Sequence, residues 1–293
     1  MSNEYLHAVR EFELDRVLGE FPSVGRGEEP PRVLDVGAGT GHQATLLQSL
    51  GYRVTAVDLP ASDYASQRVF PVIDYDGRAL PLPDGMFDVV FSSNVLEHVP
   101  DITTLLREMH RVLGPDGVAI HVLPTPAWRW WTTFVHYPWV LLRAWQVLSG
   151  SGSRRSGACA SDGQAPSRRR IGPWSALLWP RRHGERGTTL TEPYYYSARW
   201  WRATFAAAGF RTEASYPVGL FYTGGMLLAE RLPMGRRVAL ARWLGSDCTC
   251  ATNPCGSWFH FGLPNTESTG VTMLENSNVS SRLPAQDLNR AKA

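Results

Sequence analysis

The chain has 293 residues, of which 43% are hydrophobic and 19% are charged, and its formal net charge is +2. This length and balance are typical of a globular protein with a large buried core, and they exclude a disordered or collagen-like chain. The net charge is too small to indicate a nucleic-acid-binding face.

A helix and a linker open the chain. Apolar side chains recur at roughly helical spacing from Glu4 to Leu18, which predicts an amphipathic helix. Residues 22–31 are a predicted linker, so we assign residues 1–29 to an N-terminal helix and linker. The start of the chain is polar, with several acids and no secretory signal, which favours a cytoplasmic protein.

A glycine-rich loop follows the first predicted strand. The apolar run from Val33 to Val36 is typical of a buried strand, and a predicted helix from Ala44 to Leu50 comes after the loop. The glycines between them stand at alternate positions: Gly37, Gly39 and Gly41. Glycine lets the backbone turn sharply and lets a ligand approach main-chain N–H groups. The loop therefore predicts a ligand site, and a plain strand–helix turn is the alternative.

Two acids narrow the kind of ligand. Asp58 ends the second predicted strand, Arg53 to Val57, where an acid can hold the hydroxyls of a ribose; a helix N-cap is the alternative. Asp35 lies just inside the glycine loop, where its charge repels a pyrophosphate but suits a cationic ligand. The G-x-G-x-G spacing also differs from the G-x-G-x-x-G of dinucleotide sites. These features favour a cationic nucleoside derivative over a dinucleotide.

Two further motifs follow, one at Asp76-Gly77 and one running from Asn94 to the pair Glu97-His98. Together with the glycine loop and Asp58, these make four motifs in order. On these motifs the chain resembles the class I S-adenosylmethionine-dependent methyltransferases, particularly the type 11 group. The resemblance is close over about residues 30 to 125 and loose to about residue 230. It implies an α/β fold with a doubly wound, Rossmann-like, mostly parallel seven-stranded sheet. A helical or irregular insertion after strand 5 and a disordered C-terminal tail are expected with it.

The resemblance implies S-adenosylmethionine as the cofactor. The residues that match its binding positions are Asp35, Gly37, Ala38, Gly39, Gly41, Asp58, Leu59, Asp76, Gly77 and Asn94. The first motif surrounds the methionine part, Asp58 holds the ribose, and Leu59 lies beside the adenine. Asp76 accepts from the adenine amino group, although the family often has Asp-Ala where this chain has Asp-Gly. Turn chemistry is the alternative for Asp76, and helix capping for Asn94 and His98.

An insertion follows the core, which spans residues 30–126. The last predicted elements of the core are a helix at Ile102–Leu113 and a strand at Val118–Leu123. Residues 127–190 form an aromatic and arginine-rich insertion, expected on the acceptor side and partly disordered. Five of the eleven tryptophans lie in Ala127–Leu148, which predicts either a helical cap or an amphipathic segment in peripheral contact with a membrane. Between Gly150 and Leu190 there are eight arginines and two acids, which indicates a solvated stretch or a contact for an anionic partner.

Residues 191–244 are expected to close the core. They contain a predicted helix at Ala198–Ala208, ended by Gly209, and strands at 210–216 and 225–230. Residues 245–293 lack periodicity, which predicts a disordered tail. No spacing typical of a zinc site is found among the cysteines, so free thiols and no metal are predicted for Cys159, Cys248, Cys250 and Cys255.

The implied reaction is methyl transfer from a sulfonium by in-line displacement. It needs alignment of the reactants and exclusion of water. A base is needed only for a hydroxyl or amine acceptor. His183 is the first candidate base and His136 the second, with structural roles as the alternative for both. The expected acceptor is an O or N atom of a small molecule, a saccharide or a lipid-linked substrate, and no nucleic acid is expected. An NAD-dependent oxidoreductase and a non-catalytic binding protein of the same fold are the alternative functions.

Overall fold

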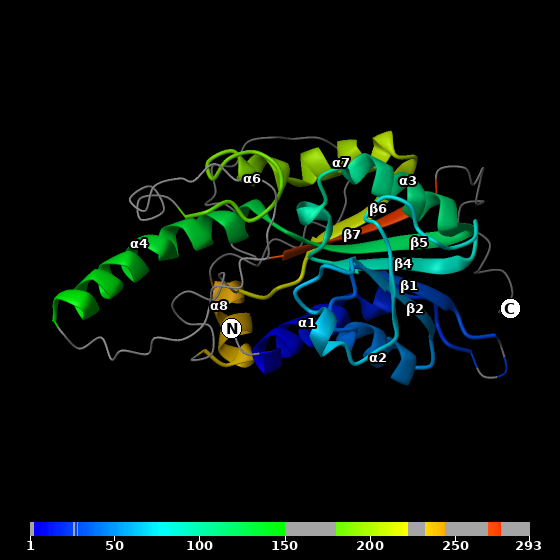
Figure 1. Ribbon diagram of the computed structural model, residues 1–293, viewed down its shortest axis with the longest axis horizontal. Helices are drawn as coiled ribbons and strands as arrows, with labels where there is room; N and C mark the ends of the chain where they lie inside the picture. The colour runs from blue at the N-terminus through cyan, green and yellow to red at the C-terminus, as the bar shows by residue number, and fades with distance from the viewer. Residues whose placement is uncertain are drawn as a thin grey trace, which may run out of the picture. The chain divides into compact units, whose positions relative to one another are not determined.

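The computed structural model in Figure 1 describes residues 3–25, 27, 29–149, 180–221, 232–243 and 269–276. These residues divide into two compact units. The sheet unit comprises the described residues among 10–123, 198–216 and 271–293, and the insertion unit comprises those among 1–9, 124–197 and 217–270. All the predicted cofactor residues therefore lie in the sheet unit, whereas His183 lies in the insertion unit.

A seven-stranded sheet forms the centre of the sheet unit, with the strand order β3-β2-β1-β4-β5-β7-β6. Its strands are β1 Arg32–Val36, β2 Arg53–Asp58, β3 Val72–Asp74, β4 Phe87–Ser93, β5 Leu113–Pro124, β6 Phe210–Pro217 and β7 Thr269–Asn276. The pairs β1–β2, β1–β4, β2–β3 and β4–β5 are all parallel. This confirms the predicted doubly wound, mostly parallel sheet. The strand order reverses between β1 and β4, and ligands of such sheets bind at the carboxyl ends of the strands beside that point.

Helices cover both faces of this sheet. They are α1 Asn3–Val17, α2 His42–Ser49, α3 Ile102–Val112 and α7 Ala198–Ala207, with 3₁₀ turns η1 Leu18–Glu20, η2 Ala65–Gln67 and η3 Leu96–His98. Figure 1 shows α2 on one face and α3 with α7 on the other. The helix α3 begins where Asp101 accepts a hydrogen bond from the Thr104 N–H, as an N-cap residue does. Gly209, with φ of 93°, follows α7 as predicted.

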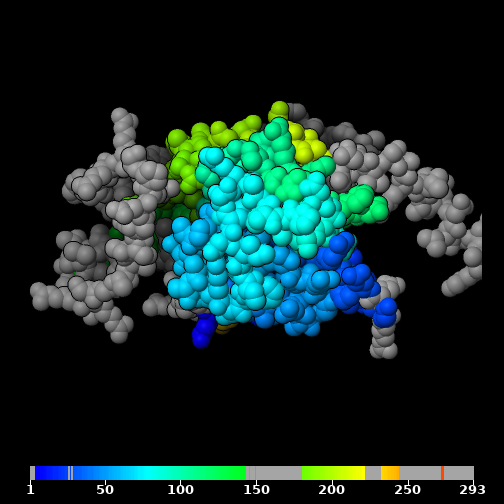
Figure 2. Space-filling model, turned by 45° about the vertical axis from the view of Figure 1, so that its right-hand side comes forward, coloured from blue at the N-terminus to red at the C-terminus, as the bar shows by residue number. Residues whose placement is uncertain are grey.

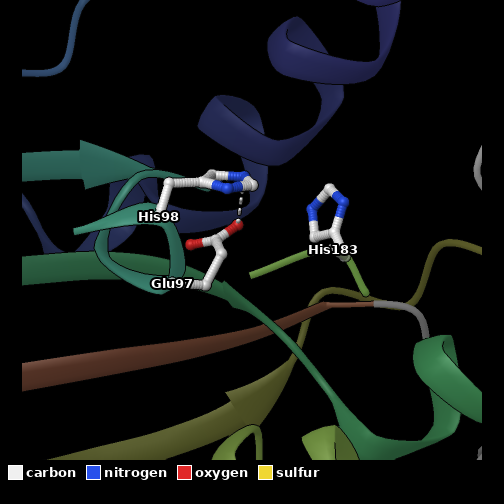
Figure 3. Close-up of side chains that lie close together, drawn as sticks. All are labelled: Glu97, His98 and His183. Atoms are coloured by element: carbon white, nitrogen blue, oxygen red, sulfur yellow. Dashed lines mark ion pairs between the residues drawn. The ribbon is translucent and has the colours of Figure 1, made fainter. Parts of the chain in front are cut away.

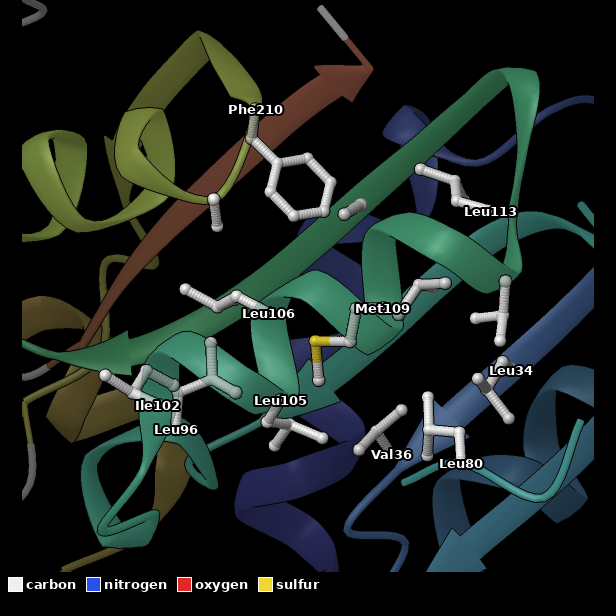
Figure 4. Close-up of a cluster of buried hydrophobic side chains, with 14 of the residues drawn as sticks. Leu34, Val36, Leu80, Leu96, Ile102, Leu105, Leu106, Met109, Leu113 and Phe210 are labelled. Carbon is white, nitrogen blue, oxygen red and sulfur yellow. The ribbon is translucent and has the colours of Figure 1, made fainter. Parts of the chain in front are cut away.

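The core of the sheet unit lies between α3 and the strands (Figure 4). The apolar face of α3 presents Leu105, Leu106 and Met109, which are fully buried, to this cluster. Leu34 and Val36 of β1 belong to the same cluster. Truncation of such a side chain to alanine typically costs about 2–5 kcal/mol, so this packing fixes the carboxyl end of β1 firmly.

Two strands differ from the prediction. The strand β5 begins at Leu113 rather than at Val118, with an irregularity in its pairing to β4 between Phe87 and Val89. The last strand, β7, is Thr269–Asn276 and lies between β5 and β6, whereas the sequence predicts it at residues 225–230, which lie outside the described residues. Val271 and Thr272 are β-branched residues that suit a strand, but so short a stretch gives no clear periodic signal.

The insertion unit is built on the long helix α4, Pro126–Leu148, which contains Pro138. The shorter helices α6, Glu192–Tyr195, and α8, Met234–Trp243, belong to the same unit. Across the described ranges, no helix combines the length and the apolar character that a membrane span requires. Residues 150–179, with five of the arginines between Gly150 and Leu190, all four cysteines and most of the predicted tail lie outside those ranges.

Candidate functional site

The glycine loop is anchored to the end of β2. The N–H groups of Gly37 and Ala38 donate to the carbonyl of Val57 over 2.8 and 3.1 Å. Gly37, Gly39 and Gly41 have φ angles of 76°, 59° and 77°. These are left-handed conformations, which glycine adopts far more readily than residues with a Cβ. The alternate glycines therefore do what the sequence predicts: they turn the chain sharply at the carboxyl end of β1.

Close neighbours also require glycine in this loop. A Cβ on Gly37 would lie 2.5 Å from a methyl group of Val95, and a Cβ on Gly41 would lie 2.5 Å from the Cβ of Phe70. A Cβ on Gly39 would meet the ring of Tyr64 at 3.5 Å, which is ordinary contact. The loop is thus held between the residue that follows β4 and the segment that follows β2. A cradle of bare backbone results, which a larger residue would fill.

Asp58 lies where the sequence predicts it, at the end of β2, and it is buried. Its carboxylate accepts hydrogen bonds from the N–H of Gly39 over 3.0 Å and from the N–H of Leu59 over 2.7 Å. Neither donor opens a helix, so these contacts differ from those of an N-cap. Each carboxylate oxygen has further lone-pair capacity. The group is therefore held in place by backbone and can still accept from a ligand hydroxyl.

Asp35 is a buried carboxyl group in the sheet unit. Its side chain is only 2% exposed, and its Oδ2 has no hydrogen-bond partner within the part of the chain that the structure describes. Burial, and after it the charge of Asp58, raises the pKa of Asp35 to about 7. Buried polar groups are nearly always paired, so this oxygen indicates a missing partner. A cationic ligand fits that need, because it would supply both a donor and the opposite charge.

Asp76 has the contacts of a turn. It is exposed, and its Oδ1 accepts from the N–H groups of Arg78 and Ala79 over 2.8 and 2.9 Å, which lower the pKa of Asp76. Leu59 lies against Gly77, because a Cβ there would be 3.1 Å from a Leu59 methyl group. Figure 2 shows this part of the chain, in light blue to cyan, on the surface of the molecule. Leu59 and Gly77 are thus side by side, as an adenine site needs, and the contact of Asp76 with adenine stays a prediction.

Asn94 adopts a left-handed backbone with φ of 54°, unlike every other non-glycine residue in the described ranges. Its N–H donates to the carbonyl of Val122 over 2.8 Å, and its Nδ2 donates to Glu13 over 3.2 Å. A non-glycine residue held in this conformation often marks a functional position. The structure therefore places Asn94 at the carboxyl end of β4, in line with the prediction.

Glu13 of α1 is a site residue that the sequence analysis missed. It is fully buried, pairs with Arg10, and accepts from Ser93 and Asn94 over 3.2 Å each. Val9 and Val17, one helical turn away on either side, are also buried. An acid in register with the apolar face of a helix is a signal of a paired, buried carboxylate, and this signal was present in the sequence.

Glu97 and His98 form the predicted pair in η3, after β4. Glu97 is buried, and the His98 Nε2 lies 3.7 Å from its Oε1. Figure 3 shows the His98 ring above the Glu97 carboxylate, with the ion pair dashed. This contact ties the two side chains together, and it supports the structural alternative for His98.

His183, the first candidate base, is held by its backbone in the insertion unit. The N–H groups of His183 and Gly184 donate to one carboxylate oxygen of Glu192 over 2.6 and 2.7 Å. The imidazole itself is exposed, with its ring centre 4.5 Å from that of Trp128. The backbone of His183 is thus held in place by two hydrogen bonds, and a catalytic role for His183 stays a prediction.

A buried ion pair supports this arrangement. The Nε of Arg129 lies 2.7 Å from Glu192, and both side chains are almost fully buried. Burial raises the pKa of Glu192, and Arg129 with the two backbone donors opposes that shift. Nothing in the spacing of the sequence links these two residues. His136, the second candidate base, is buried in α4, and its ring stacks on that of Trp139.

Comparison with known proteins identifies the domain. Residues 34–121 match the family model described as a methyltransferase domain. The malonyl-[acyl-carrier protein] O-methyltransferase of Serratia marcescens is 37% identical over 36% of this chain and 44% of its own length. The ubiquinone biosynthesis O-methyltransferase of Xanthomonas oryzae pv. oryzae is 35% identical over 38% of this chain and 48% of its own length. The chain thus spans about half the length of the curated relatives it matches.

One solved structure that is similar to this chain is an S-adenosylmethionine-dependent methyltransferase from Mesorhizobium loti. It is 16% identical, and the match covers 90% of this chain and 97% of that one with a TM-score of 0.48. The predicted family resemblance is confirmed by the family model and the curated relatives. Residues 34–121 therefore match the methyltransferase domain of the type 11 group, and S-adenosylmethionine is the cofactor that this match implies.

Proposed function

We propose that the chain is an enzyme that transfers the methyl group of S-adenosylmethionine to an O or N atom of a small molecule, a saccharide or a lipid-linked acceptor. The buried Asp35 oxygen without a partner carries this proposal, because it marks a place for positive charge beside a loop of bare backbone. An anionic cofactor such as NAD would bring its pyrophosphate toward the same charge. The geometry therefore supports the methyl donor over the dinucleotide.

The chain's own residues supply binding and orientation. Asp35 and the glycine loop would hold the methionine part, Asp58 would accept from the ribose hydroxyls, and Leu59 would pack on the adenine. The cofactor, when bound, supplies a methyl group already activated toward attack by a nucleophile. Alignment and exclusion of water are then the main demands on the protein.

Oxygen is the favoured accepting atom, because both curated relatives described above are named O-methyltransferases. A hydroxyl acceptor must lose its proton during the transfer, and His183 is our candidate to accept it. An acceptor carboxylate would need no base. Activity measured with both kinds of acceptor therefore tests the role of His183 directly. His183→Gln should lower kcat roughly a hundredfold with hydroxyl acceptors and leave kcat with carboxylate acceptors unchanged. The affinity for the cofactor should also stay unchanged. An equal loss with both kinds would contradict the role of His183 as a base.

The cofactor assignment is tested by calorimetry on Asp58→Ala. Loss of the charged acceptor should weaken S-adenosylmethionine binding at least about tenfold, or ~1.4 kcal/mol. Asp63→Ala is the matched control, because Asp63 is an exposed acid in the segment after β2. Unchanged affinity in Asp58→Ala would remove the ribose assignment. If wild-type protein bound no cofactor at all, the non-catalytic alternative would stand.

A further inference from the structure

The helix α4 carries a row of exposed apolar side chains. They are Phe134, Tyr137, Leu141, Leu142 and Trp145, and Leu141 and Trp145 are 70% and 71% exposed. Single exposed apolar residues are normal, but contiguous ones on one element mark an interaction surface. We call these five side chains the α4 outer face.

The outer face lies opposite the face that α4 buries. Among the described side chains of this helix, the large or polar ones that are buried are Trp128, Arg129, Thr132, Thr133 and His136. At about 100° per residue, the two sets centre on opposite sides of the helix. The helix therefore already satisfies its packing within the insertion unit through one face, and its second apolar face points to solvent.

Charge indicates what this second face contacts. The helix α4 contains no Asp or Glu. The sequence between Gly150 and Leu190 adds eight arginines against two acids. Of these arginines, Arg181 and Arg182 are exposed, and Arg182 pairs with Glu185. Trp and Tyr prefer the boundary between lipid and water, and amphipathic helices in chains rich in basic residues bind anionic membranes. No helix in the described ranges is long and apolar enough to span a membrane, so the expected mode is contact along the surface.

We propose that the α4 outer face binds the surface of an anionic lipid bilayer, with its apolar side chains in the interfacial region. This attachment is independent of cofactor binding. It brings the chain to a surface where lipid-linked or membrane-dissolved acceptors are concentrated. The proposal commits to lipid rather than to a protein partner, because aromatic and aliphatic side chains without any acid suit an anionic surface.

Vesicle sedimentation of the full chain tests the proposal. The probes are vesicles of phosphatidylcholine alone and vesicles with equal parts of phosphatidylcholine and phosphatidylglycerol. Wild-type protein should sediment with the anionic vesicles, and less so with neutral vesicles or at high salt. The double variant Leu141→Gln/Trp145→Gln should bind anionic vesicles at least about tenfold more weakly. Trp243→Gln is the matched control, because Trp243 is 80% exposed but lies on α8, and it should bind like wild type.

S-adenosylmethionine affinity should be unchanged in both variants, which separates loss of the surface from loss of the fold. Absence of sedimentation with either vesicle would overturn the proposal, as would equal binding by the double variant and wild type. Analytical ultracentrifugation tests the alternative that a second copy of this chain covers the α4 outer face. A dimer that dissociates in the double variant, without vesicle binding by wild type, would assign the outer face to a protein interface instead.

Discussion

Replacement of Asp35 by Asn should stabilise the free protein and weaken its cofactor binding at the same time. The buried Asp35 carboxyl has a pKa of about 7, against 3.8 for the ordinary group, so its ionisation opposes folding. This cost is absent below about pH 4, grows as the pH rises, and is complete above about pH 7. At about 1.4 kcal/mol for each unit, removal of the charge should gain up to about 4 kcal/mol at pH 8. The amide has nearly the same shape, so packing should change little.

The same substitution should change how binding depends on pH. A cationic ligand prefers the ionised carboxylate, so wild-type Asp35 must release its proton before or during binding. At about pH 6 roughly nine in ten Asp35 groups carry a proton, which should weaken wild-type binding about tenfold relative to pH 8. Asp35→Asn has no proton to release. Its affinity should be about tenfold to a hundredfold weaker than that of wild type at pH 8, and nearly independent of pH.

Calorimetric titration with S-adenosylmethionine at both pH values gives the affinities, and thermal unfolding of ligand-free protein gives the stabilities. Buffers with different ionisation enthalpies would show the released proton directly. Asp63→Asn, at an exposed acid, is the control for loss of a negative charge. The reasoning would be refuted if Asp35→Asn were less stable than wild type at pH 8, or if both proteins showed the same pH dependence of binding.

Substitutions at three other positions, Gly37, Asn94 and His121, test the site and the core. Gly37→Ala should lower the free energy of unfolding by about 2–4 kcal/mol, because its Cβ would overlap Val95 and its φ is left-handed. Gly85 also has a left-handed φ but open space around it, so Gly85→Ala should cost only about 1–2 kcal/mol. Chemical denaturation measures both, and equal costs would contradict the overlap. Asn94→Gly should keep the fold better than Asn94→Ala, because φ is 54° there, yet both should bind the cofactor more weakly by calorimetry. Burial lowers the pKa of His121 to about 3, so below about pH 6.5 the unfolded chain takes up a proton at His121 that the folded protein does not. The free energy of unfolding of wild type should therefore fall by about 2 kcal/mol between neutral pH and pH 5. Chemical denaturation at these two pH values should show that His121→Gln lacks this added loss.

Local features of the sequence predicted the conformation of the glycine loop and the position of Asp58 well. The glycine spacing specified left-handed backbone at Gly37, Gly39 and Gly41, and the acid at the end of β2 lies against that loop. These features depend on a few neighbouring residues and on the way parallel strands end at a common edge. The two strands β1 and β2 then place Asp35 and Asp58 close enough for their charges to interact.

Contacts between distant parts of the chain could not be predicted in the same way. Glu13 joins Asn94 across the sheet unit, and Arg129 joins Glu192 within the insertion unit. Neither pair has a characteristic spacing, because each depends on tertiary packing. The position of β7 was missed for a related reason: its place between β5 and β6 is decided by the sheet rather than by its own short sequence.

Calorimetric titration of the full chain with S-adenosylmethionine, S-adenosylhomocysteine and NAD tests the central claim most directly. The account predicts micromolar or tighter binding of the first two and no binding of NAD, at a pH above the pKa of Asp35, about 7. Binding of NAD, or failure of both S-adenosyl compounds to bind, would contradict it.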